Sequence, residues 1–149
     1  MIILDTNVVS EPIKPDGARG VQYWLDEQIA ETLYLTSISL SELLLGVELL
    51  PSGKRKVGLA AALSELLSTL FGTRILPFDQ QAATLYAARV SSARAAGKAI
   101  SMADGQIAAI AAVHGFTVAT RDTAPFVAAG VPVVNPWETR VHEESPEWK

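Results

Sequence analysis

The chain has 149 residues, of which 49% are hydrophobic and 19% charged, and this composition excludes global disorder and predicts one globular domain. It contains no cysteine, which excludes disulfides, thiolate metal sites and a cysteine nucleophile, and it has no apolar run long enough to span a membrane, so we expect a cytoplasmic protein. The 16 acidic residues outnumber the 12 basic ones, whereas proteins that bind nucleic acids usually carry a basic excess or a basic face.

The first third of the chain predicts two short strands and two helices. Residues 1–4 form a continuous apolar run that ends at Asp5, which is typical of a strand buried on both faces. Prolines then interrupt the chain, and the spacing of apolar residues predicts a helix over residues 17–29. Residues 33–36 predict a second strand and residues 39–50 a second helix, which a Pro-Ser-Gly turn ends.

The rest of the chain continues this alternation. Helices are expected over residues 57–71 after a basic trio, 79–97 with Asp79 as N-cap, 102–114 with Ser101 as N-cap, and 124–129. Strands are expected over residues 74–78, 116–120 and 131–134. The last strand belongs at an edge, because Pro132 cannot donate a ladder hydrogen bond. Such alternation predicts an α/β domain with a parallel sheet, in which ligands bind outside the carboxyl ends of the strands.

Four carboxylates fall where this topology brings distant segments together. Asp5 and Asp122 follow the first and fourth predicted strands, and Glu42 and Asp104 lie in the first turns of two predicted helices. Four unpaired carboxylates at one edge repel one another, and Mg²⁺ or Mn²⁺, which prefer oxygen ligands, would relieve that repulsion. Without these four residues the chain has equal numbers of acidic and basic residues, so its acidity fits a metal site.

Each of these acids also has a purely structural interpretation. Glu42 and Asp104 each follow a serine in the spacing of a capping box, or nearly so, and acids in a first turn favour the helix dipole. Asp122 fits a turn. Asp5 is harder to explain, because a carboxylate that ends a buried strand is costly unless it is exposed at the edge, hydrogen-bonded or bound to a metal.

The segments around these acids, taken in order, resemble the motifs of the PIN-domain nucleases. The opening motif of that family resembles residues 3–10 (ILDTNVVS), its second acidic motif resembles residues 42–46 (ELLLG), and its third resembles residues 104–111 (DGQIAAIA). Its closing segment resembles residues 120–126 with 133–137. The resemblance covers residues 1–138, and within the family the pattern looks most like the VapC-type toxins, including the FitB-like branch.

This resemblance implies a three-layer α/β/α sandwich around a central parallel sheet over residues 1–138, followed by a polar tail over residues 139–149. It implies an Mg²⁺- or Mn²⁺-dependent endoribonuclease that acts as the toxin of a type II toxin–antitoxin system. The implied partners are an RNA substrate, a second copy of the chain, and a small antitoxin that blocks the site. The resulting hetero-oligomer would reach operator DNA only through the antitoxin, and no membrane partner is expected.

The mechanism that we expect is hydrolysis of an RNA phosphodiester by a metal-activated water. Asp5 and Asp104 would hold one cation, and Glu42 or Asp122 a weaker second one. Many relatives have a further Asp where this chain has Pro125, which weakens the case for the second cation. Three short polar residues beside the acids are expected to orient waters or a phosphate oxygen: Thr6, Asn7 and Thr120.

Two alternatives stay open. The chain could be a weakly active or inactive PIN-like binding subunit that works in a complex of antitoxin and operator DNA. It could also be another acid-rich α/β protein, such as an aspartyl-phosphate phosphatase or a receiver. The phosphatase signature has a second Asp where this chain has Asn7, and the paired acids of a receiver are missing.

Overall fold

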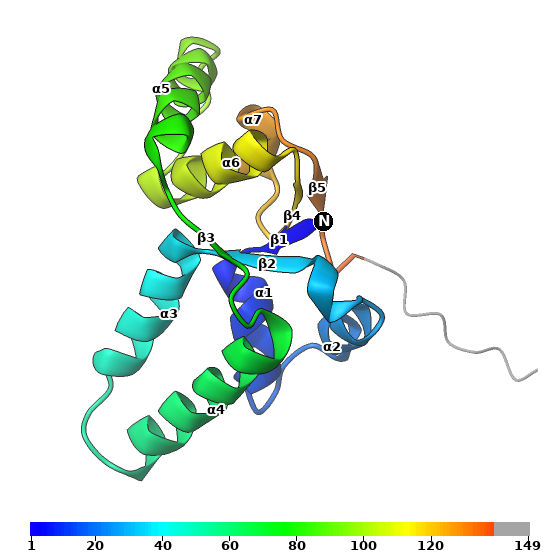
Figure 1. Ribbon diagram of the computed structural model, residues 1–149, viewed down its shortest axis with the longest axis vertical. Helices are drawn as coiled ribbons and strands as arrows, with labels where there is room; N and C mark the ends of the chain where they lie inside the picture. The colour runs from blue at the N-terminus through cyan, green and yellow to red at the C-terminus, as the bar shows by residue number, and fades with distance from the viewer. Residues whose placement is uncertain (139–149) are drawn as a thin grey trace, which may run out of the picture.

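The central element of the fold is a five-stranded parallel sheet with helices on both faces, as the computed structural model of residues 1–138 shows (Figure 1). Its strands are β1 (Ile2–Leu4), β2 (Leu33–Thr36), β3 (Ile75–Leu76), β4 (Thr117–Ala119) and β5 (Val133–Val134). Their spatial order is β3-β2-β1-β4-β5, and every neighbouring pair is parallel. The predicted α/β class is therefore confirmed, and β5 lies at an edge as expected. The predicted polar tail, residues 139–149, lies outside the described residues.

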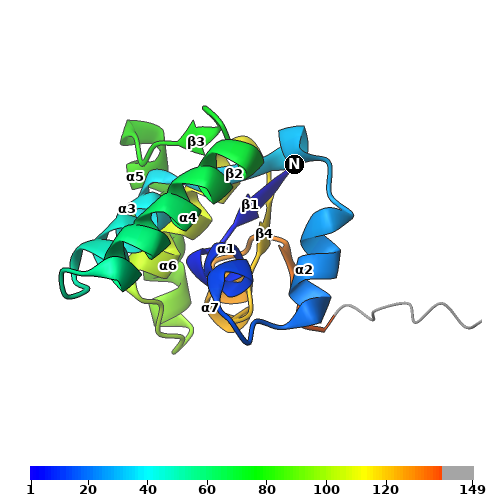
Figure 2. The same ribbon diagram turned by 90° about the horizontal axis from the view of Figure 1, so that it is seen from below.

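Successive residues of the central strand β1 enter two separate cores, one on each face of the sheet. Ile3 belongs to one core and Leu4 to the other. The first core is covered by α5 (Gln80–Ala95), α6 (Met102–His114) and α7 (Ala124–Ala128). The second is covered by α1 (Thr6–Ser10), α2 (Arg19–Asp26), α3 (Ser37–Glu48) and α4 (Lys54–Leu70). Figure 1 shows one helical layer on each side of the sheet, and Figure 2 shows the face with α1, α2 and α4 toward the viewer. The expected three-layer arrangement is therefore confirmed.

Short 3₁₀ segments complete the connections. They are η1 (Glu11–Ile13), which continues directly from α1, and η2 (Ala30–Thr32), which leads into β2. Within residues 1–138, no helix is long and apolar enough to cross a membrane.

Helix α2 is shorter than the helix predicted over residues 17–29, and α4 begins at Lys54, before its predicted start. Two further differences bear on the site. The helix predicted over residues 39–50 begins at Ser37, because the hydroxyl of Thr36 accepts a 3.1 Å hydrogen bond from the amide of Ser39 and caps the helix. Glu42 therefore lies in the second turn of α3, and its predicted place in a first-turn capping box is wrong. The other difference is α1, a short helix that the sequence did not predict.

Helix α1 begins at the residue after Asp5 because that side chain caps it. The Oδ1 atom of Asp5 accepts a 2.8 Å hydrogen bond from the amide of Thr6. The segment contains two β-branched valines, which have low helix propensity, and burial of both compensates for that preference. The Asp5 cap was not predicted, whereas the predicted caps Asp79 and Ser101 are confirmed. The Asp79 side chain accepts a hydrogen bond from the amide of Ala82, and the Ser101 hydroxyl accepts one from the amide of Asp104.

Candidate active site

Asp5 lies at the carboxyl end of the central strand, where its backbone and side chain are both fixed. Its amide donates a 2.9 Å hydrogen bond to the carbonyl of Ala119, which extends the pairing of β1 with β4. Its two carboxylate oxygens accept different hydrogen bonds: Oδ1 from the amide of Thr6 and Oδ2 from the hydroxyl of Thr120, each at 2.8 Å. The side chain is thus held in one orientation while only 7% of the residue is exposed.

Burial raises the pKa of Asp5 to about 6. The hydrogen bonds from Thr120 and Thr6 oppose this shift, because both stabilise the ionised carboxylate. The negative charges of Asp104 and Glu42 add to the shift, because a nearby like charge disfavours ionisation. A carboxylate with so high a pKa at the end of a buried strand is a candidate functional group.

Glu42 reaches the same edge of the sheet from α3. It is exposed, and its Oε1 atom accepts a 3.1 Å hydrogen bond from the hydroxyl of Thr6. Thr6 therefore links two of the acids, since its amide binds Asp5 and its hydroxyl binds Glu42. The sequence analysis expects Thr6 to orient waters or a phosphate oxygen, which stays a prediction, whereas its partners in the structure are the carboxylates of Asp5 and Glu42.

Asp104 lies in the first turn of α6 and is partly buried. Burial raises its pKa, a hydrogen bond of its side chain with Ser101 opposes the shift, and the negative charge of Asp122 adds to it. Asp122 is exposed, and its amide donates a 3.2 Å hydrogen bond to the hydroxyl oxygen of Thr120. Thr120 thus joins the loop of Asp122 to the carboxylate of Asp5.

The structure brings the four acids into electrostatic contact, and no cationic side chain among residues 1–138 forms an ion pair with them. Asp5 interacts with Asp104 and Glu42, and Asp104 with Asp122. Within residues 1–138 the only ion pair, between Lys14 and Glu11, involves none of them. In the same part of the chain, however, no group of three or more His, Cys, Asp or Glu side chains is gathered closely enough to hold one metal ion. The four acids therefore lie near one edge of the sheet, but among residues 1–138 they do not form a complete set of ligands for one metal ion.

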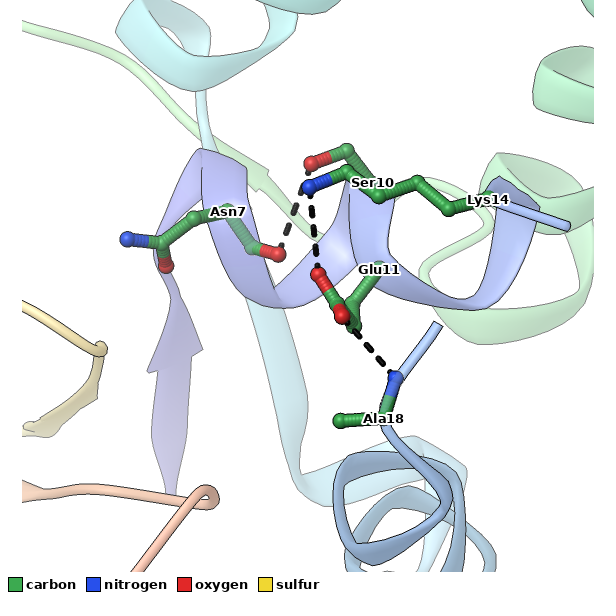
Figure 3. A network of polar contacts seen from close by, with 5 residues as sticks. All are labelled: Asn7, Ser10, Glu11, Lys14 and Ala18. Atoms are coloured by element: carbon green, nitrogen blue, oxygen red, sulfur yellow. Dashed lines mark hydrogen bonds and ion pairs between the residues drawn. The ribbon is translucent and has the colours of Figure 1, made fainter. Parts of the chain in front are cut away.

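The chemistry of the available groups nevertheless fits a hard divalent cation. Carboxylates, hydroxyls and amide oxygens are the ligands that Mg²⁺ and Mn²⁺ prefer. Asn7, two residues after Asp5, has a buried Oδ1 atom without a hydrogen-bond partner. Such an atom costs free energy unless something binds it. The backbone carbonyl of Asn7 accepts a 3.4 Å hydrogen bond from the Ser10 hydroxyl, and the side-chain amide of Asn7 points away from Ser10 and Glu11 (Figure 3).

Glu11 is a buried acid that the sequence analysis missed. It is 7% exposed, and it accepts a 2.9 Å hydrogen bond from the amide of Ala18 and pairs with Lys14 at 3.3 Å (Figure 3). The Ala18 contact is the main reason that its pKa is lowered, with Lys14 assisting. Gly17 closes the same loop, where an added Cβ would lie 2.3 Å from the Glu11 carbonyl oxygen. Glu11 thus anchors the loop after α1. An acid followed by proline is usually exposed, so the local sequence does not indicate that Glu11 is buried.

Two grooves flank the acids. The first, of about 370 Å³, runs between α1 and the α3–α4 pair, and its polar lining includes Thr6, Glu42, Lys14 and Arg55. The second, of about 720 Å³, lies beside the start of α6 and includes both Asp104 and Asp122. The acids therefore border open surface on two sides. Sequence spacing could not show the grooves, because each depends on how neighbouring helices and loops pack.

Comparison with known proteins gives the family. Residues 2–131 match the PIN domain. The chain is 50% identical over 139 residues to the VapC ribonuclease Y4jK of Sinorhizobium fredii, a match that covers 93% of this chain and 99% of that protein. It is 52% identical over 137 residues to the toxin FitB of Neisseria gonorrhoeae, with coverage of 92% and 99%.

The fold agrees with this assignment. A solved structure of FitAB bound to the IR36 DNA fragment contains a chain that is 49% identical and superposes with a TM-score of 0.90, over 95% of this chain and 99% of the other. Both the sequence and the arrangement of helices and strands are thus shared over nearly the whole length. The chain therefore belongs to the PIN domain family, as a VapC-type protein of the FitB-like branch.

Proposed function

We propose that this chain is an Mg²⁺- or Mn²⁺-dependent endoribonuclease that acts as the toxin of a type II toxin–antitoxin pair. One observation carries the proposal: Asp5 is buried with a raised pKa, and three more carboxylates share its edge of the sheet without a cationic partner among residues 1–138. Such a set is costly unless a cation compensates it. The similarity to the VapC ribonuclease supports RNA as the substrate.

Different residues at this edge of the sheet would bind the cation and orient its ligands. Asp5 and Asp104 are the residues that would hold the cation, with Glu42 and Asp122 at its periphery. The Thr6 amide and the Thr120 hydroxyl fix the orientation of the Asp5 carboxylate. A bound divalent cation supplies activation of the attacking water and stabilisation of charge on the phosphate. Asp5 must be ionised to bind a cation, and the hydrogen bonds from Thr120 and Thr6 favour that ionised form because they lower its pKa.

We also propose that an antitoxin binds this chain and connects it to operator DNA. The complex of FitAB with a DNA fragment supports this role. Four large apolar side chains on and near the α3–α4 pair are exposed, which supports an interface with an antitoxin or a second copy: Leu44, Leu45, Leu49 and Val57.

A second candidate function is that of a binding subunit with little or no hydrolytic activity. One observation favours it, namely that the described residues contain no gathered group of three metal-ligating side chains. In that case the acids would hold a basic side chain of the antitoxin in place of a cation.

The experiment that separates the two is incubation of the antitoxin-free protein with total RNA and Mg²⁺ or Mn²⁺. We expect discrete fragments that disappear with EDTA and with Asp5→Asn. The matched control is Asp16→Asn, which alters an exposed aspartate in the loop before α2 and should cleave like the parent. Cleavage that persists in Asp5→Asn, or in EDTA, would contradict the proposed nuclease. Absence of cleavage in the parent would favour the binding subunit.

A further inference from the structure

The groove beside α6 is lined by one lysine, two aspartates and several apolar side chains. Its lining includes Lys98, Asp104 and Asp122 together with Pro125 and Val127 of α7. Lys98 forms no ion pair with either acid within the described residues, although all three line the same space. Its ammonium group is therefore available to a ligand that enters the groove.

The backbone under Lys98 is firmly placed. Helix α5 ends at Ala95, and Gly97 has a φ of +76°, a conformation that other residues rarely adopt. The amide of Lys98 then donates a 2.9 Å hydrogen bond to the carbonyl of Ala93. Ile100, two residues later, is buried in the core. Lys98 thus extends from an ordered turn whose position relative to Asp104 is set by the fold.

The apolar wall of the groove is fixed as well. Val127 is 56% exposed, while the preceding Phe126 is fully buried and anchors α7 in the core. Arg89 of α5 holds the end of α7, since its Nη1 atom donates to the carbonyls of Ala129 at 2.8 Å and Gly130 at 3.2 Å. An exposed apolar side chain on an anchored helix keeps its contact surface without an ordering cost. Figure 1 shows α7 beside α6 on this face of the sheet.

The chemistry of this groove matches one nucleotide of a single strand. A phosphate group is repelled by Asp104 and Asp122 and attracted by Lys98, so it would bind at the Lys98 end. The face of a nucleobase is apolar and would lie on the wall formed by Pro125 and Val127. Only an unpaired base exposes that face, because base pairs in a duplex are stacked on one another.

We propose that a single-stranded segment of RNA binds in this groove, with one backbone phosphate on Lys98 and the adjacent base against Val127. This inference rests on the proposed RNA substrate and adds where, and in which form, the strand lies. It places the strand beside Asp104 and Asp122, with one phosphate on Lys98. The next phosphate would lie near the two acids only where a divalent cation offsets their negative charge.

The test measures binding apart from cleavage. The probe is a fluorescein-labelled single-stranded RNA of twelve mixed nucleotides, and the protein is the full chain carrying Asp5→Asn, in Mg²⁺. Fluorescence anisotropy gives the affinity over a range of salt concentrations. We expect Lys98→Gln to lower the affinity at low salt and to reduce the slope of log K against log salt by about 0.7, the value for one phosphate on a single strand. The matched control Lys54→Gln, on the exposed start of α4, should leave the slope unchanged.

Val127 gives a second, different signature. Val127→Ser removes apolar contact without changing charge, so we expect about threefold weaker binding at every salt concentration and an unchanged slope. The same sequence presented as a duplex should bind more weakly than the single strand. Both substitutions lie at exposed positions, and thermal unfolding would verify that each variant is folded.

Several results would overturn the inference: no RNA binding by the Asp5→Asn protein, equal slopes for Lys98→Gln and Lys54→Gln, no effect of Val127→Ser, or equal affinity for duplex and single strand. A slope change in Arg55→Gln in place of Lys98→Gln would put the strand in the other groove and would also overturn it. Failure of the nuclease proposal is recognised separately. In that case the parent chain does not cleave RNA, whereas the slope change in Lys98→Gln persists.

Discussion

The hydroxyl of Thr120 donates a 2.8 Å hydrogen bond to Oδ2 of Asp5, although the two residues are 115 positions apart in the sequence. Parallel pairing of β1 with β4 makes this contact possible, because it brings the carboxyl ends of both strands to one edge. The same hydroxyl oxygen accepts a hydrogen bond from the amide of Asp122. Thr120 therefore controls both the charge state of one acid and the position of another.

Replacing Thr120 by Val is expected to change the pH dependence of RNA cleavage. The hydroxyl lowers the pKa of Asp5, so its removal raises that pKa further above its ordinary value. Because cleavage needs the ionised carboxylate, the acid limb of the rate–pH profile should move to higher pH. Thr120→Ser keeps the donor and should restore the parent profile. An acid limb that stays in place in Thr120→Val would contradict this role.

Asp5 is expected to destabilise the metal-free fold at neutral pH. Its pKa is about 6 in the folded chain against an ordinary 3.8, so the folded state binds more protons between these values. Stability should therefore fall as the pH rises through this range, by about 3 kcal/mol in the limit. In EDTA, Asp5→Asn should then be more stable than the parent at pH 7.5 but not at pH 4, as measured by denaturant unfolding. Asp16→Asn serves as the control, and equal stability of Asp5→Asn and the parent at both pH values would refute the argument.

Glu11 is expected to affect the pH dependence of folding stability in the opposite direction to Asp5. Its pKa is lowered, mainly by the Ala18 amide, so its ionised form stabilises the fold above the ordinary value of 4.5. That contribution is lost as the pH falls through the lowered pKa. Glu11→Gln should cost about 1 kcal/mol at pH 7, and the difference from the parent should shrink in acid. Glu27→Gln, at an exposed position, should have little effect at any pH, and a similar loss there would rule out a specific role for Glu11.

Two helical glycines make a matched pair for testing the packing behind Asp104. A Cβ added to Gly105 would lie 2.8 Å from Cε2 of Tyr86 and 2.9 Å from Cγ2 of Val90, where α6 packs on α5. Gly105→Ala should therefore cost about 1–3 kcal/mol of folding stability. Gly46 in α3 faces open space, and Gly46→Ala should stabilise the fold by about 0.5–1 kcal/mol. Thermal unfolding that ranks the two variants the other way would show that the α5–α6 contact is looser than described.

The strands and most helices were predictable because they depend on local pattern. Each predicted strand has its counterpart, and the serine and aspartate caps at Ser101 and Asp79 formed where expected. The place of Asp5 followed from the apolar run before it. The start of α3 was not predictable from the same rules, since Thr36 and Ser39 are both competent caps and the end of β2 decides between them.

The candidate site was only partly predictable for a physical reason. Strand topology places acids at a common edge, and that part of the expectation needs only the order of elements. The links through Thr6 and Thr120 depend on the directions of side chains from four segments that are separate in the fold, which a linear pattern does not encode. The burial of Glu11 and the grooves depend on how helices pack, for which the sequence carries no local signal.

The central claim is that carboxylates from separate elements act together as one cation site, and direct Mn²⁺ binding tests it most closely. Isothermal titration calorimetry of the metal-free chain should show Mn²⁺ binding that Asp104→Asn and Asp5→Asn each weaken strongly, while Asp16→Asn leaves it unchanged. Because Asp5 and Asp104 are 99 positions apart, loss of binding in both variants would mean that the fold, and not a local motif, assembles the site. Mn²⁺ binding that survives either substitution, or that is absent from the parent chain, would contradict the claim.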